Sequence, residues 1–106
     1  MKKIKDILND VGVPVSLLTY EGKEDTYITF FCINDYTVES ADDVEKLKAC
    51  DYQIDIWSKG NFNKLAKEVE KRMLENGFRK INYFELYEKD TKIYHKVMRF
   101  YYMEEN

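Results

Sequence analysis

The sequence predicts an α+β domain: a mainly antiparallel sheet, a short N-terminal helix and one longer amphipathic helix packed on one face. In residues 52–59, apolar side chains alternate with polar ones, which is the period of a strand with two unlike faces. In residues 62–76, apolar side chains recur with the spacing of one helical stripe. Residues 81–87 and 92–102 are strand-like runs joined by a short polar turn, which predicts a hairpin.

The N-terminal part predicts a short helix followed by two strands. The helix is expected within residues 2–10 and is stopped by Gly12 and Pro14. Its inward side chains are Ile4, Ile7, Leu8 and Val11. Residues 15–20 form a plausible strand. Residues 26–33 are β-branched and aromatic with apolar side chains on both faces, so we expect a central strand covered on each side, by helices or by a neighbouring subunit.

The middle of the chain is acidic. Residues 34–41 are polar and turn-prone, which predicts a loop. Residues 42–50 fit either a helical turn or the start of a strand, and the absence of a breaker favours a strand over 47–57. Seven acids stand against two bases from position 34 to position 55, a local net charge of −5. A solvated loop is the ordinary interpretation of such a run, and a functional surface is the less common one. The loop candidates are Asp35, Glu39, Asp42 and Asp43.

The longer helix has recognisable ends. Its apolar stripe consists of Phe62, Leu65, Ala66, Val69 and Met73. Asn61 or Ser58 can accept hydrogen bonds from the free amides of the first turn. Gly77 suits the left-handed position that ends a helix, and Phe78 is expected to fold back on the helix end.

Length and composition indicate one domain covering residues 1–106. The aromatic fraction is 15%, carried by nine Tyr, six Phe and one Trp. A core of this size cannot hold that many rings, which hints at a subunit interface, although small strand-rich proteins are also rich in tyrosine. The net charge of −3 argues against binding nucleic acid by phosphate neutralisation.

The N-terminus does not predict secretion. Its basic start lacks the apolar stretch of a signal peptide, and no run approaches the length of a membrane span. We therefore expect a cytoplasmic protein without membrane contact, in which Cys32 and Cys50 are free thiols.

No group of residues predicts catalysis or metal binding. His95 is the only histidine and lacks a nearby Cys/His cluster, so a structural or hydrogen-bonding role is favoured. Cys50 lies among acids, which raise the pKa of a thiol and reduce its reactivity. Asp42 and Asp43 lack the ligand spacing of a calcium loop. We expect no enzymatic activity, no cofactor and no metal.

Two segments carry a resemblance to a known family. Tyr52–Lys59 with the helix after it, and Leu86–Thr91 leading into Ile93–Phe100, resemble the tail-completion proteins of long-tailed bacteriophages and prophages. This group is also described as tail-terminator or head–tail joining proteins. The N-terminal pattern is similar too: a short helix, the Gly12-Val13-Pro14 turn and then strands, one of them aromatic.

The resemblance implies a small α+β virion protein that forms a ring, commonly a hexamer, at the head-proximal end of the tail. Such a ring terminates the tail tube, joins the tail to the head connector and lets DNA pass without binding it specifically. The protein would assemble in the host cytoplasm and end in the neck of the virion. A closed ring needs two different contact faces on each subunit. We expect subunit contacts near Trp57 and the last hairpin, with Tyr94, His95, Arg99 and Tyr101 as further candidates.

Other classes of function stay open. Another neck or connector adaptor protein would fit the same features. A small nucleic-acid-binding module would need exposed strand aromatics among basic residues, which Tyr94, Lys96, Arg99 and Tyr101 offer faintly. The overall acidity speaks against that alternative.

Overall fold

The computed structural model describes residues 3–39 and 46–105 of the chain. These residues form an α+β domain with two helices and five strands, which confirms the predicted fold class. The elements, in chain order, are α1 (Ile4–Ile7), β1 (Val15–Leu17), β2 (Tyr27–Glu39), β3 (Lys46–Ser58), α2 (Asn63–Glu75), β4 (Arg79–Glu88) and β5 (Ile93–Glu105).

The five strands form one sheet in the order β1-β2-β3-β5-β4. The β2–β3, β3–β5 and β4–β5 pairs are antiparallel, and only the short β1 runs parallel to its neighbour. β1 pairs with β2 from Ile28 to Phe30 only. Within the described residues, the rest of β2 therefore has no strand on its outer side, and the outer side of β4 is likewise free.

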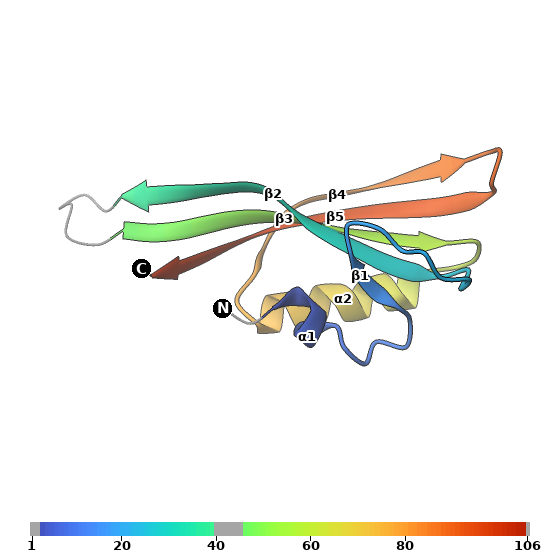
Figure 1. Cartoon of the computed structure of the whole chain (residues 1–106), viewed down its shortest axis with the longest axis horizontal. Coiled ribbons are helices and arrows are strands. Elements are labelled where there is room, and N and C mark those ends of the chain that lie inside the picture. The colour runs from blue at the N-terminus through green and yellow to red at the C-terminus, as the bar shows by residue number, and fades with distance from the viewer. Residues whose placement is uncertain (1–2, 40–45, 106) are drawn as a thin grey trace.

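Both helices lie on the same face of the sheet, as Figure 1 shows. The core forms between the helices and this face, which we call the helix face. Alternate residues of the two central strands point into it, including Ile54 and Ile56 of β3 and Met98 and Phe100 of β5, each no more than 1% exposed. The far ends of β2, β3 and β5 extend beyond the helices, so the molecule is elongated, measuring 52 × 26 × 23 Å (Figure 1).

The longer helix is held by the stripe and the caps that the sequence predicts. Phe62, Ala66, Val69 and Met73 are buried, whereas Leu65 lies at the edge of the stripe and is only partly buried. Asn61 Oδ1 accepts a hydrogen bond of 2.9 Å from the backbone amide of Asn63. Gly77 has a φ of 89°, and the amide of Phe78 donates to the carbonyl of Met73 at 3.0 Å. The turn at Gly77 folds Phe78 back on the helix end, as predicted, and its side chain is only 1% exposed.

Arg72 connects α2 to the N-terminal segment. Its guanidinium donates to the carbonyl of Ile7 at 3.3 Å, forms an ion pair with Asp10, and bonds Glu68 one helical turn earlier at 2.8 Å. Hydrogen bonding to Arg72 holds the pKa of the Asp10 and Glu68 carboxyls below their ordinary values.

The prediction of a loop over residues 34–41 is wrong for most of that segment. Residues 34–39 continue β2, and they pair with the start of β3 through partners such as Asp35 with Cys50 and Thr37 with Lys48. Polar residues suggested a loop here. They are tolerated in strands because this part of the hairpin extends beyond the helices, where both faces of the sheet meet solvent. Asp42 and Asp43 lie outside the described residues.

We expect the buried stripe of α2 to dominate its contribution to stability. Replacing Met73, which is 0% exposed, with Ala should lower the free energy of unfolding by about 2–5 kcal/mol, because it leaves a cavity in the core. Leu74 on the same helix is 45% exposed and serves as the control, where the same change should cost no more than ~0.5 kcal/mol. Denaturant unfolding measures both, and equal losses would contradict the packing described.

The Arg72 contacts predict an acid-dependent stability. Because the folded state lowers the pKa of Asp10 and Glu68, their contribution is complete above the unfolded pKa values of about 4 and is lost as pH falls through the lower folded values. The stability difference between wild type and Arg72→Gln should therefore be largest near neutral pH and shrink below about pH 4. Thermal unfolding across pH measures this difference, and a pH-independent difference would contradict the prediction.

Candidate functional site

Neither helix lies on the opposite face of the sheet (Figure 1). We call it the uncovered face. Side chains alternate along strands, so the neighbours of the core residues point onto it. Its central members are Thr29 of β2, Gln53, Asp55 and Trp57 of β3, His95, Val97, Arg99 and Tyr101 of β5, and Phe84 and Leu86 of β4.

A buried carboxylate lies at the centre of this face. The side chain of Asp55 is 4% exposed, and its Oδ1 lies 2.6 Å from Nε2 of His95. The same oxygen accepts a hydrogen bond of 2.8 Å from the side-chain amide of Gln53. An ionised carboxylate can only accept, so in the ionised form of Asp55 the Nε2 of His95 is the donor. Two donors therefore compensate Asp55 for its removal from water.

Aromatic rings cover this polar centre. The ring of Trp57 stacks on His95, with centroids 3.7 Å apart and planes 13° from parallel. The indole nitrogen of Trp57 donates to Thr29 Oγ1 at 3.0 Å, which fixes the ring flat against the sheet. Tyr27 stacks on Trp57, and Tyr20 stacks on Tyr27 in turn. The stack shields Thr29 and Asp55, although no other layer of the described chain lies above them.

The remainder of the uncovered face offers apolar surface and the guanidinium of Arg99. Arg99 donates to Gln53 Oε1 at 3.0 Å, and its guanidinium carbon lies 5.2 Å from the ring centroid of Phe84. Phe84 is 37% exposed and Leu86 is 51% exposed. Met103 and Tyr36 add exposed side chains toward the far end of the sheet. A rigid, amphipathic surface of this kind suits contact with another protein.

Four of the five residues proposed from sequence lie together on this face: Trp57, His95, Arg99 and Tyr101. Tyr94 does not. It points to the helix face, where its ring contacts Phe62 and Tyr87. Asp35, proposed as a loop acid, is an exposed residue of β2 on the helix-face side.

Sequence reasoning missed the buried Asp55 and Thr29 and the partly buried Gln53. Asp55 stands at an outward position of the alternating segment, where a solvated carboxylate is the ordinary expectation. Its burial depends on His95 and Trp57, which come from β5 and from its own strand two residues on. Only the strand pairing brings these three side chains together.

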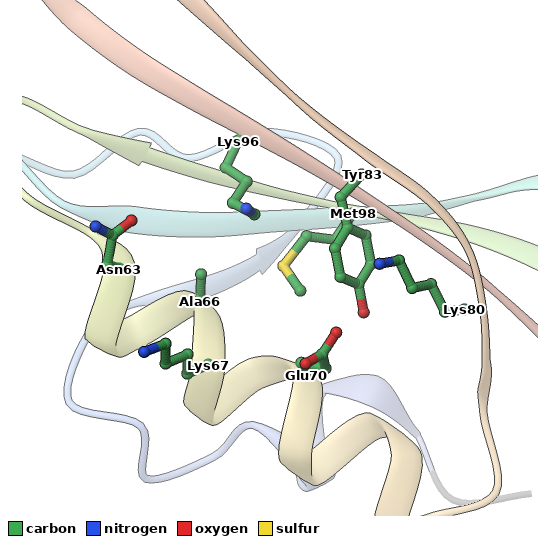
Figure 2. A pocket seen from close by; sticks show the side chains of 8 residues that line it. All are labelled: Asn63, Ala66, Lys67, Glu70, Lys80, Tyr83, Lys96 and Met98. Carbon is green, nitrogen blue, oxygen red and sulfur yellow. The ribbon is translucent and has the colours of Figure 1, made fainter.

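A second feature lies on the helix face, where α2 leaves β4 uncovered. It is a hollow of about 240 Å³, which we call the lysine hollow, and Figure 2 shows its lining side chains. They are Asn63, Ala66, Lys67, Glu70, Lys80, Tyr83, Lys96 and Met98.

The lysine hollow is centred on Tyr83. Its hydroxyl oxygen is buried and makes no hydrogen bond among the described residues, although the hydroxyl and the Glu70 carboxylate point toward one another in Figure 2. Burial raises the pKa of Tyr83 above its ordinary value, and the Glu70 carboxylate that faces the hydroxyl raises it further. Lys80 Nζ lies 4.1 Å from the centroid of the Tyr83 ring, and Lys96 pairs with Glu85 at 3.4 Å.

The described residues do not assemble a metal site. No group of three His, Cys, Asp or Glu side chains among them could hold a metal ion. Cys32 and Cys50 are free thiols. His95 contacts Asp55 and Trp57 rather than a nucleophile. Neither of the described helices is long and apolar enough to cross a membrane.

Comparison with known proteins gives a match at the level of fold. No protein-family model matches the sequence, and no curated protein matches it. Among solved structures, the chain is similar to a chain of the "Virion of native gene transfer agent (GTA) particle", with a TM-score of 0.59 and 10% sequence identity. The similarity covers 97% of this chain and 84% of that one. The two chains therefore share a fold over almost the whole length of this chain.

The buried Asp55–His95 pair predicts a measurable cost when the carboxylate is removed. Asp55→Ala should lower the free energy of unfolding by about 1–3 kcal/mol, because the Gln53 amide and the His95 ring lose their acceptor inside the sheet. Asp90→Ala in the exposed β4–β5 turn is the control and should have little effect. Urea unfolding of both variants tests this, and a neutral Asp55→Ala variant would contradict the pairing.

Proposed function

We propose that this chain is a virion structural protein of the tail-completion type, which forms a ring at the head-proximal end of a phage or prophage tail. The observation that carries the proposal is the shared fold, over 97% of the chain, with a chain of a gene transfer agent virion. The sequence resemblance in residues 52–59 and 86–100 supports the more specific role.

The uncovered face supports an assembled state. A face that carries Trp57, Arg99, Phe84 and Leu86 leaves apolar surface in water, and such patches in small proteins mark contacts with other proteins. Several of the many aromatic rings lie on the uncovered face rather than in the core that forms between the helices and the sheet. In the proposed ring, neighbouring subunits or the tail tube cover this surface.

The acidic end of the sheet supports a role in which DNA passes through the ring without binding to it. Asp35 and Asp51 lie in the part of the β2–β3 hairpin that extends beyond the helices. If this end faces the lumen, its charge repels DNA phosphates and lets the genome slide. The partners in this proposal are further copies of the chain, the tail tube and the head connector. The protein needs no cofactor and catalyses no reaction. It assembles in the host cytoplasm and remains in the virion.

The nucleic-acid-binding alternative receives weaker support. Arg99 is the one arginine at the centre of the uncovered face, and its guanidinium is already engaged by Gln53 and Phe84. The carboxylates of Asp51 and Asp55 share that face. Phosphate binding there would be opposed by these acids. An adaptor protein at another position of the neck would share every feature described and differs only in its neighbours.

Deleting the gene from its parent phage or prophage tests the proposal. We expect filled heads and separate, unattached tails, some of them overlong, because nothing would terminate the tube or join it to the head. Electron microscopy of the lysate provides the measurement, and a plasmid copy of the gene should restore joined virions. Normal joined virions from the deletion strain would refute the proposed function.

A further inference from the structure

We propose that Cys32 of β2 and Cys50 of β3 are a site of oxidative modification: they join in an intramolecular disulfide that ties the two strands together where they leave the core. Both residues are free thiols in the structure. The modification concerns this chain alone and is independent of the proposed function.

Strand pairing places both thiols on the helix face. Cys32 lies opposite Tyr52, and Tyr52 packs against the core, so Cys32 points to the same face as that ring. Cys50 precedes Tyr52 by two residues in β3 and therefore points to this face as well. The two thiols are thus diagonal neighbours on adjacent strands.

A bulge in β2 turns Cys32 toward its neighbour. The register of β2 against β3 shifts between Cys32 and Asn34, and such a bulge bends the strand and redirects the side chains beside it. Cys32 Sγ donates to the carbonyl oxygen of Asn34 at 3.5 Å. Asn34 pairs with Asp51, the residue next to Cys50. The sulfur of Cys32 therefore leans along the strand in the direction of Cys50.

The two thiols are close enough to affect each other's surroundings. Burial raises the pKa of the Cys32 thiol above its ordinary value, and the Cys50 thiol and then the Asp35 carboxylate raise it further. Burial and then Cys50 also raise the pKa of Tyr52. Oxidation through a thiolate is accordingly faster at mildly alkaline pH than at neutral pH.

The exposure of the two cysteines sets the order of the reaction. Cys32 is exposed, whereas Cys50 is partly buried, so Cys32 meets the oxidant first. Its thiolate attacks one sulfur of a low-molecular-weight disulfide such as oxidised glutathione, which forms a mixed disulfide and releases one glutathione. The Cys50 thiolate then attacks the Cys32 sulfur, forms the Cys32–Cys50 bond and displaces the second glutathione. The protein loses two electrons and two protons, and both pass to the released glutathione thiols.

The bond lies at the boundary between the core and the extended part of the hairpin. We call residues 34–39 and 46–51 the hairpin arm, which extends beyond the helices in Figure 1. Strand pairing at the base of the arm is interrupted by the bulge, and a covalent bond there fixes the register of the two strands. It also closes the chain between positions 32 and 50, which restricts the unfolded state more than the folded state.

Thiol–disulfide exchange on the full-length protein tests the site. The reduced protein is equilibrated with oxidised and reduced glutathione at mildly alkaline pH, quenched in acid and analysed by mass spectrometry. We expect the wild type to lose two hydrogens without keeping glutathione. Trypsin should then release residues 24–46 joined to residues 49–59, because lysines separate the two cysteines. Cys50→Ser should instead keep one glutathione on Cys32.

A matched control moves the second thiol by one position. In the double variant Cys50→Ser, Asp51→Cys, the new thiol lies on the uncovered face, while the chain between the two cysteines is almost unchanged in length. Its closed fraction should be lower than that of the wild type by roughly tenfold or more in native buffer, and similar to it in urea. For the wild type itself, closure should be favoured in native buffer over urea by a similar factor.

Three results would overturn the proposal. The first is a wild-type protein that yields only glutathione adducts or intermolecular dimers. The second is equal closure of the wild type and the double variant while circular dichroism shows both to be folded. The third is wild-type closure that is no more favourable in native buffer than in urea, which needs no variant to fold.

The effect on the hairpin arm is measured by hydrogen exchange and thermal unfolding. Amides of the hairpin arm should exchange severalfold more slowly in the oxidised protein, and its unfolding midpoint should rise, because a bond favoured by the folded state stabilises that state. Dithiothreitol should reverse both changes. Unchanged exchange in the arm, or a lower midpoint after oxidation, would show that the bond does not secure the two strands and would overturn that part of the proposal.

Discussion

The burial of the α2 stripe against one face of the sheet is the interaction on which the rest of the structure depends. Val69 and Met73 pack on the side chains that β3 and β5 turn toward the helix, and Phe78 closes the end of this contact. Arg72 then attaches the N-terminal segment to the same helix. Because both described helices lie on this face, the side chains of the opposite face must pack without a helix above them.

On the uncovered face, aromatic side chains lie flat against the sheet and shield the polar groups beneath them. Trp57 is held by Thr29 and stacks on His95, and together they shield a carboxylate that two donors satisfy. A polar centre of this kind is costly if any partner is missing, which makes the arrangement rigid. The surface around it remains apolar and accessible. A small protein that keeps one face rigid and accessible is suited to bind another protein there.

The chain shares its fold with a chain of the gene transfer agent virion, and among the described residues its sheet has two edges without a neighbouring strand. The fold match concerns the path of the backbone at 10% identity, and the side chains of the contact surfaces are this chain's own. An elongated subunit with unlike edges can build a ring from a single kind of contact.

The sequence by itself determined the class of the fold, the extent and caps of α2, and the last hairpin, because these follow from local periodicity and from capping chemistry within a few residues. It also identified Trp57, His95, Arg99 and Tyr101 as surface candidates, which strand alternation places on one face. Only the tertiary structure decided that residues 34–39 form a strand, since their pairing partners lie across the hairpin and their polarity masks the pattern. The same holds for the burial of Asp55 and for the lysine hollow, because each depends on side chains from elements that are distant in sequence and meet only when the sheet forms.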